Sequence, residues 1–423
     1  MALKILHTAD WHLGQRFYDN SRVTEHRHFL NWLITQLAHT QPDVLIVAGD
    51  VYDGVNPSGD SERLFFDFLE RAIDTVEGLQ ILITAGNHDG GGRLEATASL
   101  AARQRIFLRG TVQRISSQDN TLGQPAYDHL LLPLRSRTTE QAEALALLVP
   151  FLRPNDVGGY DTEAIQQFFK QLHHAADGSR WGTLPRILVA HLYTSGTDLS
   201  ATDEAERYVV GGQAELPAET LGHTAYTALG HIHKAMRIQQ SQAWYAGSPI
   251  PLSFAELGYT HGVNLVTLDD KGQAHVERLV HTPLRRLQRL PERGAVSVDE
   301  LFKLANRLPA AEEHPDATTW PYLEVCLRSD AHDYEQLREL RELLATRAVV
   351  FCKFTRLDTP LPEATADTGV ESLAHFVQAT PREMLERIYR NKHQDDLPEA
   401  LATRFAEVEA AIAKQEPTDT SNA

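Results

Sequence analysis

Residues 43–53 read DVLIVAGDVYD, and this stretch decides the fold class. Its apolar run ends in Gly49-Asp50, which is typical of a strand that is covered on both faces and stops at a polar turn. Amphipathic helices are predicted around it at 21–38 and 60–76, where apolar residues recur at helical spacing. Similar apolar runs occur along the first 280 or so residues as LKILHT, LQILITAG, RILVAHL and YTALGHI. Strands that alternate with helices predict a layered α/β domain.

The chain changes character after this domain. The run PLRRLQRLPERG, which begins at residue 283, is a boundary marked by Pro and Arg. Helices are predicted at 298–307 and 334–345, between the strands YLEVCLR and AVVFCKF, which together indicate a small α+β unit. The predicted domains are therefore a first domain (1–282), a small capping unit (283–358), a linker (359–370), C-terminal helices (371–415) and a disordered tail (416–423).

The composition restricts the partners of the protein. The 423 residues carry a formal net charge of −17, which argues against coating DNA by charge alone. A local basic groove, or a partner that supplies most of the DNA contact, would allow DNA binding in spite of this negative charge.

The two cysteines, Cys326 and Cys352, cannot build a disulfide framework, so a reducing, cytoplasmic location is expected. The first apolar run is too short for a signal peptide, and no run approaches the roughly 20 residues of a membrane helix.

Five short polar motifs each follow a predicted strand. Any one of them is a weak signal, since such pairs of residues are common in long chains. The carboxyl ends of strands in open α/β sheets converge on one cleft, so the ordered set has a much stronger meaning. The motifs are Asp10-x-His12, Gly49-Asp50-x-x-Asp53, Gly86-Asn87-His88-Asp89, Ala190-His191 and Gly230-His231-x-His233.

The residue types in these motifs fit a pair of divalent metal ions. Two neighbouring ions need one carboxylate that bridges them and further nitrogen and oxygen ligands. Asp50 suits the bridge, because the glycine before it permits a close approach. His231 and His233 point the same way on an extended segment, and Asp10 and His12 share their spacing. The mixture of carboxylate, amide and imidazole favours Mn²⁺, with Fe²⁺, Zn²⁺ or Mg²⁺ as alternatives.

In this order, the five motifs resemble those of the calcineurin-like metallophosphoesterases. That resemblance implies a layered α/β sandwich with two central sheets. Longer stretches resemble the SbcD family of nuclease subunits from residue 3 to about 270, and beyond that point the resemblance rests on layout. These stretches are ILHTADWHLGQRFYD, VAGDVYD, AGNHD, VPFLRP, ALGHIHKA and YAGSPIPLSF.

The resemblance implies a role for each residue of the motifs. The ligands of the first ion would be Asp10, His12, Asp50 and His233. The ligands of the second ion would be Asp50, Asn87, His191 and His231. His88 would protonate or stabilise the leaving 3′ oxygen. Asp53 would orient His88, although an acidic residue at this place is equally typical of a cap on the following segment.

The resemblance also implies substrates and partners. The activity would be in-line, two-metal hydrolysis of DNA in end processing, recombination and replication. It would comprise an ATP-dependent 3′–5′ exonuclease on double-stranded ends and an endonuclease on single strands and hairpins. The C-terminal helices would dock on an SMC-like ATPase of the SbcC type, or alternatively pack on their own chain. A homodimer within a heterotetramer is expected.

Three other functions compete with this one. Protein phosphatases and cyclic-nucleotide phosphodiesterases use a similar ligand set. The sequence GDVYDGV lacks the Asp-Arg-Gly continuation associated with the phosphatases, and a small-molecule esterase would not need the C-terminal third of the chain. A DNA-end scaffold without turnover would be expected to have lost some ligands, whereas all of them and His88 are present here.

Other polar residues near the motifs have ordinary interpretations. His7 is expected to pack in the core, and His26 to lie on a solvated helix face or at a helix end. Asp89 would orient His88 or simply begin the next segment. Residues 198–204 would border the cleft or form a surface loop.

Overall fold

The computed structural model describes residues 3–117, 120–157, 159, 162–195, 216–239, 241–328 and 334–357, with 398, 401–402 and 404–405. The chain divides into two units, Met1–Thr359 and Pro360–Ala423, and each is considered by itself. The predicted linker, the tail and the loop 198–204 lie outside the described residues. Of the predicted C-terminal helices, only 398, 401–402 and 404–405 are described, and all of these except 398 are helical. These assignments and the boundary after residue 282 stay predictions.

A six-stranded sheet is built around β1 (Leu3–Thr8). β1 pairs in parallel with β4 (Val44–Ala48) and antiparallel with β15 (Gly262–Leu268). Every residue of β4 is buried, as its unbroken apolar sequence predicts. The remaining strands of this sheet are β5 (Gln80–Thr84), β6 (Ile106–Arg109) and β16 (Ala274–Val280).

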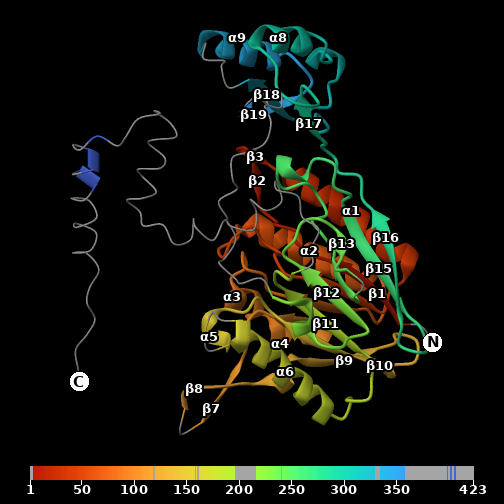
Figure 1. Cartoon of the computed structure of the whole chain (residues 1–423). Coiled ribbons are helices and arrows are strands. Elements are labelled where there is room, and N and C mark those ends of the chain that lie inside the picture. The colour runs from red at the N-terminus through yellow and green to blue at the C-terminus, as the bar shows by residue number, and fades with distance from the viewer. Residues whose placement is uncertain are drawn as a thin grey trace. The chain divides into compact units, whose positions relative to one another are not determined.

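A second six-stranded sheet packs against the first (Figure 1). Its order is β13-β14-β12-β11-β10-β9, and β10, β11, β12 and β14 run parallel. Buried side chains of both sheets, such as Ile46 and Val189, form one apolar cluster between them. The predicted sandwich with two central sheets is therefore confirmed. The strands are β9 (Leu131–Arg135), β10 (Ala142–Val149), β11 (Arg186–His191), β12 (Tyr226–Gly230), β13 (Met236–Arg237) and β14 (Ala243–Tyr245).

Helices cover the outer faces of both sheets. α1 (Val23–Thr40) and α2 (Gly59–Thr75) pack on the first sheet, and α6 (Thr162–Gly178) packs on the second. The shorter elements are β2 (Arg16–Phe17), β3 (Asn20–Ser21), α3 (Gly91–Glu95), α4 (Ala98–Ala101), β7 (Arg114–Ser117), β8 (Asn120–Pro125), α5 (Pro154–Val157) and the 3₁₀ turn η4 (Phe254–Glu256).

Two histidines test the sequence interpretation of the core. His7 is fully buried and lies 2.8 Å from the Tyr226 hydroxyl, which confirms it as a core residue. His26 lies in the first turn of α1, at a helix end as one of its two interpretations expected, but it is only 1% exposed, so the solvated face is excluded. It shares the buried stripe of α1 with Phe29 and Leu33, which lie three and seven residues further along the helix.

A small sheet of three parallel strands lies within residues 287–357, and we call this sheet and its helices the cap. Its strands are β17 (Leu287–Leu290), β18 (Tyr322–Arg328) and β19 (Val350–Leu357). α8 (Val298–Asn306) and α9 (Tyr334–Leu344) pack together on one face of this sheet (Figure 1). The cap therefore has an apolar core of its own.

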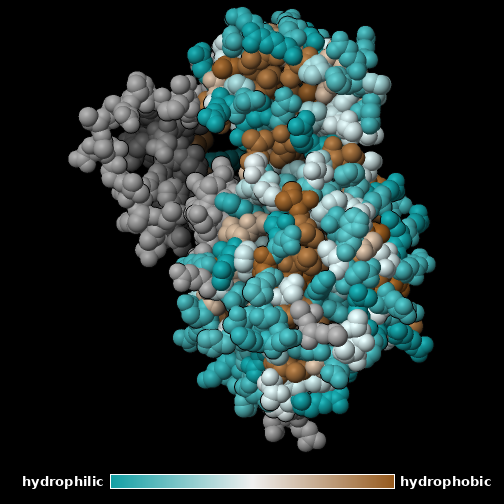
Figure 2. Space-filling model, turned by 90° about the vertical axis from the view of Figure 1, so that its right-hand side faces the viewer, coloured by the Kyte–Doolittle hydropathy of each residue, from teal (hydrophilic) through white to brown (hydrophobic). Residues whose placement is uncertain are grey.

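Most of the face seen in Figure 2 is hydrophilic, with hydrophobic residues gathered in patches. Within the described ranges, no helix is long and apolar enough to cross a membrane.

Several acidic side chains lie in the otherwise apolar interior and require partners there, because a buried charge is costly unless it is paired. The buried acidic residues are Asp10, Glu25, Asp43, Asp50, Asp89, Glu256 and Glu324.

Glu25 is the centre of a buried contact between the cap and the first sheet's helices. It accepts hydrogen bonds from the Arg22 guanidinium at 2.7 Å and from the Tyr322 hydroxyl of β18 at 2.7 Å. Arg22 also donates to the carbonyl oxygen of Pro251 at 2.5 Å. The side chain of Arg22 is fully buried and that of Glu25 almost so. Cap, helix α1 and the segment around Pro251 are thus joined by one charged pair.

Replacing Arg22 by Ala should destabilise this unit strongly, because Glu25 would remain as a buried charge that has lost its cationic partner. We expect the apparent free energy of unfolding to fall by about 3–5 kcal/mol for Arg22→Ala, and by about 1 kcal/mol for Tyr322→Phe. Urea denaturation followed by circular dichroism measures both. The matched control is Arg63→Ala, since Arg63 pairs with Asp60 on the surface. An Arg22 variant as stable as this control would contradict the account.

Candidate metal centre

The five motifs meet at one edge of the sandwich, where the parallel strands end. β1 ends two residues before Asp10, and β4 ends two residues before Asp50. The backbone N–H of Asp10 donates to the carbonyl of Gly49 at 3.1 Å, which joins these two turns. The second sheet is attached to the same place, because the N–H of His231 donates to Asp10 Oδ1 at 2.9 Å. The expected convergence of strand ends is therefore present.

Four of the predicted ligands have backbone conformations that residues other than glycine seldom adopt. The φ angles are 54° at Asp10, 46° at His12, 49° at Asp50 and 99° at His231. Such conformations cost free energy and persist only where the surrounding structure imposes them. They cluster at functional sites, and here they coincide with the motifs.

Two glycines make room for the polar side chains. A Cβ atom at Gly49 would lie 2.1 Å from His191 Nδ1, and one at Gly86 would lie 2.1 Å from Asp50 Oδ1. Gly49 was expected to help Asp50 approach its partners. It also leaves the space that the ring of His191 occupies.

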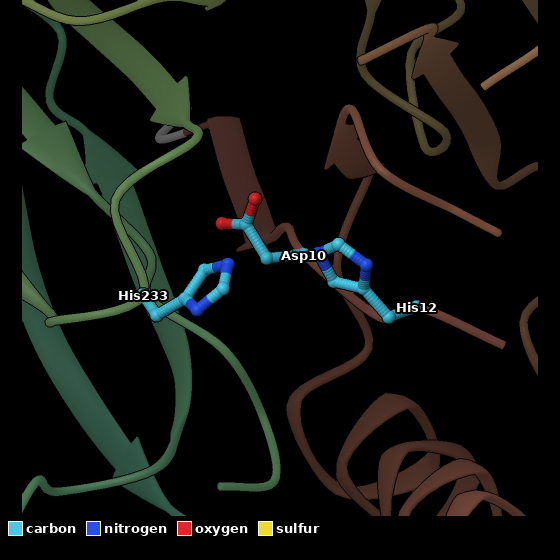
Figure 3. Close-up of side chains that lie close together, drawn as sticks. All are labelled: Asp10, His12 and His233. Carbon is cyan, nitrogen blue, oxygen red and sulfur yellow. The ribbon is translucent and has the colours of Figure 1, made fainter. Parts of the chain in front are cut away.

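The six other predicted ligands come together around Asp50. Figure 3 shows Asp10, His12 and His233, whose possible ligand atoms lie within 4.8 Å of one another. A second group, with the same limit, consists of Asp10, Asp50 and His191. The carboxylate of Asp50 lies 3.5 Å from His12 Nε2 and 3.3 Å from His191 Nε2.

Asn87 completes the arrangement beside His191 and His231. Its Oδ1 lies 3.0 Å from His191 Nε2 and 3.0 Å from His231 Nδ1. An amide oxygen and two imidazoles that face one point form a mixed oxygen and nitrogen donor set, as divalent transition metals prefer.

Most of the histidines are held through Nδ1, which leaves Nε2 directed at the centre. His191 donates from Nδ1 to the carbonyl of Ala48 at 2.9 Å, and His233 donates to Glu256 Oε1 at 2.9 Å. His12 Nδ1 lies 3.3 Å from Asp53 Oδ1. Acceptors of this kind fix the tautomer and the orientation of histidines that bind metals.

Unpartnered atoms show that the donor set suits a cation. Among the described residues, no hydrogen-bond partner reaches Asp10 Oδ2 or His12 Nε2, although both atoms are buried. Buried polar atoms without partners are rare, and an ion is one of the few things that satisfy them. The site residues therefore fit divalent metal ions.

The electrostatics lead to the same conclusion. Burial opposes ionisation of Asp50, but the charge of His191 and its hydrogen bond outweigh burial and hold the pKa of Asp50 well below its usual range. Burial, and the charge of Asp50, raise the pKa of Asp10. Burial lowers the pKa of His191, whereas Asp50 and Asp10 raise it to about 9. Two carboxylates crowded in the interior create a strong demand for positive charge.

His88 and Asp53 lie together beside this centre. The ring of His88 donates from Nδ1 to the backbone carbonyl of Asp53 at 3.0 Å. The backbone N–H of His88 donates to Asp50 Oδ1 at 2.9 Å. The contact between Asp53 and His88 is thus made by the backbone, while the carboxylate of Asp53 faces His12. His88 is partly exposed, as a group that meets a substrate must be.

Two buried carboxylates that contact the motifs, those of Asp89 and Glu256, were missed or left open by the sequence analysis. Asp89 is fully buried and accepts hydrogen bonds from the N–H groups of Gly86, Val51 and Tyr52, so it joins two motif turns. Burial and the nearby Asp50 raise its pKa to about 6. Glu256 was not singled out, although an acidic residue within the apolar run SFAEL is the signal that would have found it.

The comparisons with known proteins agree with this geometry. Residues 3–235 match the family described as calcineurin-like phosphoesterase. The chain is 37% identical over 343 residues to the SbcD subunit of the SbcCD nuclease of Rhodobacter capsulatus, covering 78% of this chain and 81% of that one. It is 31% identical over 365 residues to the Escherichia coli K12 protein of the same name, covering 82% and 84%.

The Bacillus subtilis protein of that name is 30% identical over 346 residues, covering 80% of this chain and 83% of that one. These matches are longer than the stretch that the family model covers. The five motifs of the metal centre lie within residues 3–235. The chain therefore belongs to the calcineurin-like phosphoesterases, within the family of SbcD nuclease subunits.

Proposed function

We propose that this protein is a metal-dependent DNA nuclease that hydrolyses phosphodiester bonds at the centre around Asp50. The observation that carries the proposal is the convergence of six ligand-type residues on the buried carboxylate of Asp50, with the partly exposed His88 beside it. The similarity to the SbcD subunit of the SbcCD nuclease from three bacteria supports DNA as the substrate.

Each proposed ligand has a place in the arrangement described above. Asp50 would be shared by two ions, with Mn²⁺ as the expected metal and Fe²⁺, Zn²⁺ or Mg²⁺ as alternatives. The first ion would be held by Asp10, His12, Asp50 and His233, and the second by Asp50, Asn87, His191 and His231. Bound ions would supply positive charge to the phosphodiester and lower the pKa of water.

The chain's own residues supply the remaining functions. His88 donates from Nδ1 to the Asp53 carbonyl, so its Nε2 is the atom free to exchange a proton with the leaving 3′ oxygen. The N–H of His88 is bound to Asp50, so the ring is held at a fixed distance from the centre. Asp53 acts on two histidines at once, through its carbonyl on His88 and through its carboxylate on His12.

The finer activity is also part of the proposal. We infer a 3′–5′ exonuclease on double-stranded ends that depends on a partner's ATP, and an endonuclease on single strands and hairpins. An SbcC-type ATPase would bind the helices at 371–415 and supply the DNA clamp that a chain of net charge −17 lacks. We also propose a homodimer within a heterotetramer. A cytoplasmic location is proposed as well, and the free thiols Cys326 and Cys352 support it.

Replacing His88 by Ala should abolish most of the catalysis without removing the metal. We expect hydrolysis of end-labelled duplex and hairpin DNA in Mn²⁺ to fall by about 100- to 10,000-fold, the usual contribution of a general acid. Bound Mn²⁺ should stay at the wild-type level. His275→Ala is the control, since that ring is largely exposed on β16.

A phosphopeptide and a cyclic nucleotide are tested in the same assay, with the ATPase partner present. Cleavage of either small phosphoester by a wild-type protein that leaves DNA intact would overturn the proposed substrate. Loss of Mn²⁺ from the His88 variant would overturn its proposed role as a residue that acts on the leaving group.

Replacing Asp50 by Asn should remove both ions, because the shared carboxylate is lost from each set. Asn87→Ala should remove only the second ion, since Asn87 belongs to one set. Atomic absorption after desalting counts the Mn²⁺ bound to each purified variant. Asp74→Asn, on the exposed side of α2, is the matched control and should bind as wild type does. Equal Mn²⁺ content in the Asp50 and Asn87 variants would contradict a shared ligand.

A further inference from the structure

Glu256 is a carboxylate in an environment that would normally exclude one. It lies in the turn η4 and is only 1% exposed. Its neighbours in the chain are Phe254, Ala255 and Leu257, so the segment itself offers no polar reason for its burial. An ionised carboxylate inside a protein needs hydrogen bonds to both of its oxygens.

The two oxygens of Glu256 have separate tasks. Oε1 accepts a hydrogen bond from His233 Nδ1 at 2.9 Å. Oε2 accepts from the backbone N–H of Leu252 at 3.0 Å and from the hydroxyl of Ser248 at 3.0 Å. One oxygen therefore holds the carboxylate in place, while the other holds the imidazole.

From this geometry we propose that Glu256 is a positioning residue for the metal ligand His233. An acceptor at Nδ1 fixes the proton on that nitrogen and leaves the lone pair of Nε2 for an ion. The ring is thereby held toward Asp10 and His12, as seen in Figure 3. This inference rests on the proposed metal centre and adds a residue that none of the five motifs contains.

The segment that carries Glu256 is itself held from both sides. The carbonyl of Pro251 accepts from Arg22 at 2.5 Å, and that of Phe254 accepts from Arg289 of the cap strand β17 at 3.3 Å. Arg289 pairs with Glu324 of β18 at 2.5 Å. The cap therefore supports the segment that positions His233, which gives the cap a structural connection to the first ion.

Asp53 provides a comparison within the same site. Its carboxylate lies 3.3 Å from His12 Nδ1, but its side chain is 41% exposed. A solvated carboxylate can be replaced by water, whereas the buried Glu256 cannot. The loss of Glu256 should accordingly have the larger effect on metal binding.

The test is a calorimetric titration of the metal-free full chain with Mn²⁺, comparing wild type with Glu256→Gln. Glutamine has the same shape, but its amide cannot accept from both His233 and the Leu252 N–H with the same two atoms. We expect the affinity of one of the two Mn²⁺ sites to fall by about 10- to 100-fold, with the other unchanged. Glu277→Gln, exposed on β16, is the matched control and should titrate as wild type does.

A second variant covers the case in which Glu256→Gln fails to fold. Ser248→Ala keeps the carboxylate and removes one of its anchors, so it should weaken the same site in the same direction by a smaller factor. If the wild-type protein binds Mn²⁺ at two sites and both variants bind it with the same affinities, this inference is overturned and the proposed function stands. A wild-type protein that binds no Mn²⁺ would overturn the proposed function itself, and the inference with it.

Discussion

The carboxylate of Asp50, buried at the end of a central strand, is the interaction on which the rest of the structure depends. This carboxylate lies between His12 and His191 and accepts a hydrogen bond from the backbone N–H of His88. Gly86 must be glycine for this contact, because a Cβ atom would lie 2.1 Å from Asp50 Oδ1. Both sheets and the turns of the five motifs bring partners to this group. In the turn after β1, Asp10 and His12 adopt positive φ angles to do so.

Two buried carboxylates close together are energetically unfavourable, and the packed sandwich around them keeps the site rigid. Burial raises the pKa of Asp10, and the charge of Asp50 nearby acts in the same direction. Packed apolar side chains between the sheets hold the strand ends in spite of that repulsion. The cap contributes from a distance, since Tyr322 contacts Glu25 and Arg289 contacts Phe254. Segments far apart in the sequence are therefore joined by these contacts.

The sequence predicted the parts of this arrangement that are local. Apolar runs such as VLIVA and the polar residues directly after them follow from strand burial, so a layered α/β domain and the convergence of the motifs could be predicted. The sandwich with two central sheets was implied by the family resemblance. Contacts between distant segments could not. Glu256 reaches His233 across 23 residues, and Asp89 reaches Tyr52 across 37. The burial of His26 was missed for the same reason, because its polar ring lies on the buried stripe of α1.

The most direct test of the account is anomalous diffraction at the manganese edge from crystals of the full chain grown with Mn²⁺. We expect two peaks on opposite sides of the Asp50 carboxylate, one near His12 and His233 and the other near Asn87 and His231. A single peak, or peaks that do not contact Asp50, would contradict the claim that this carboxylate organises a two-metal phosphoesterase centre.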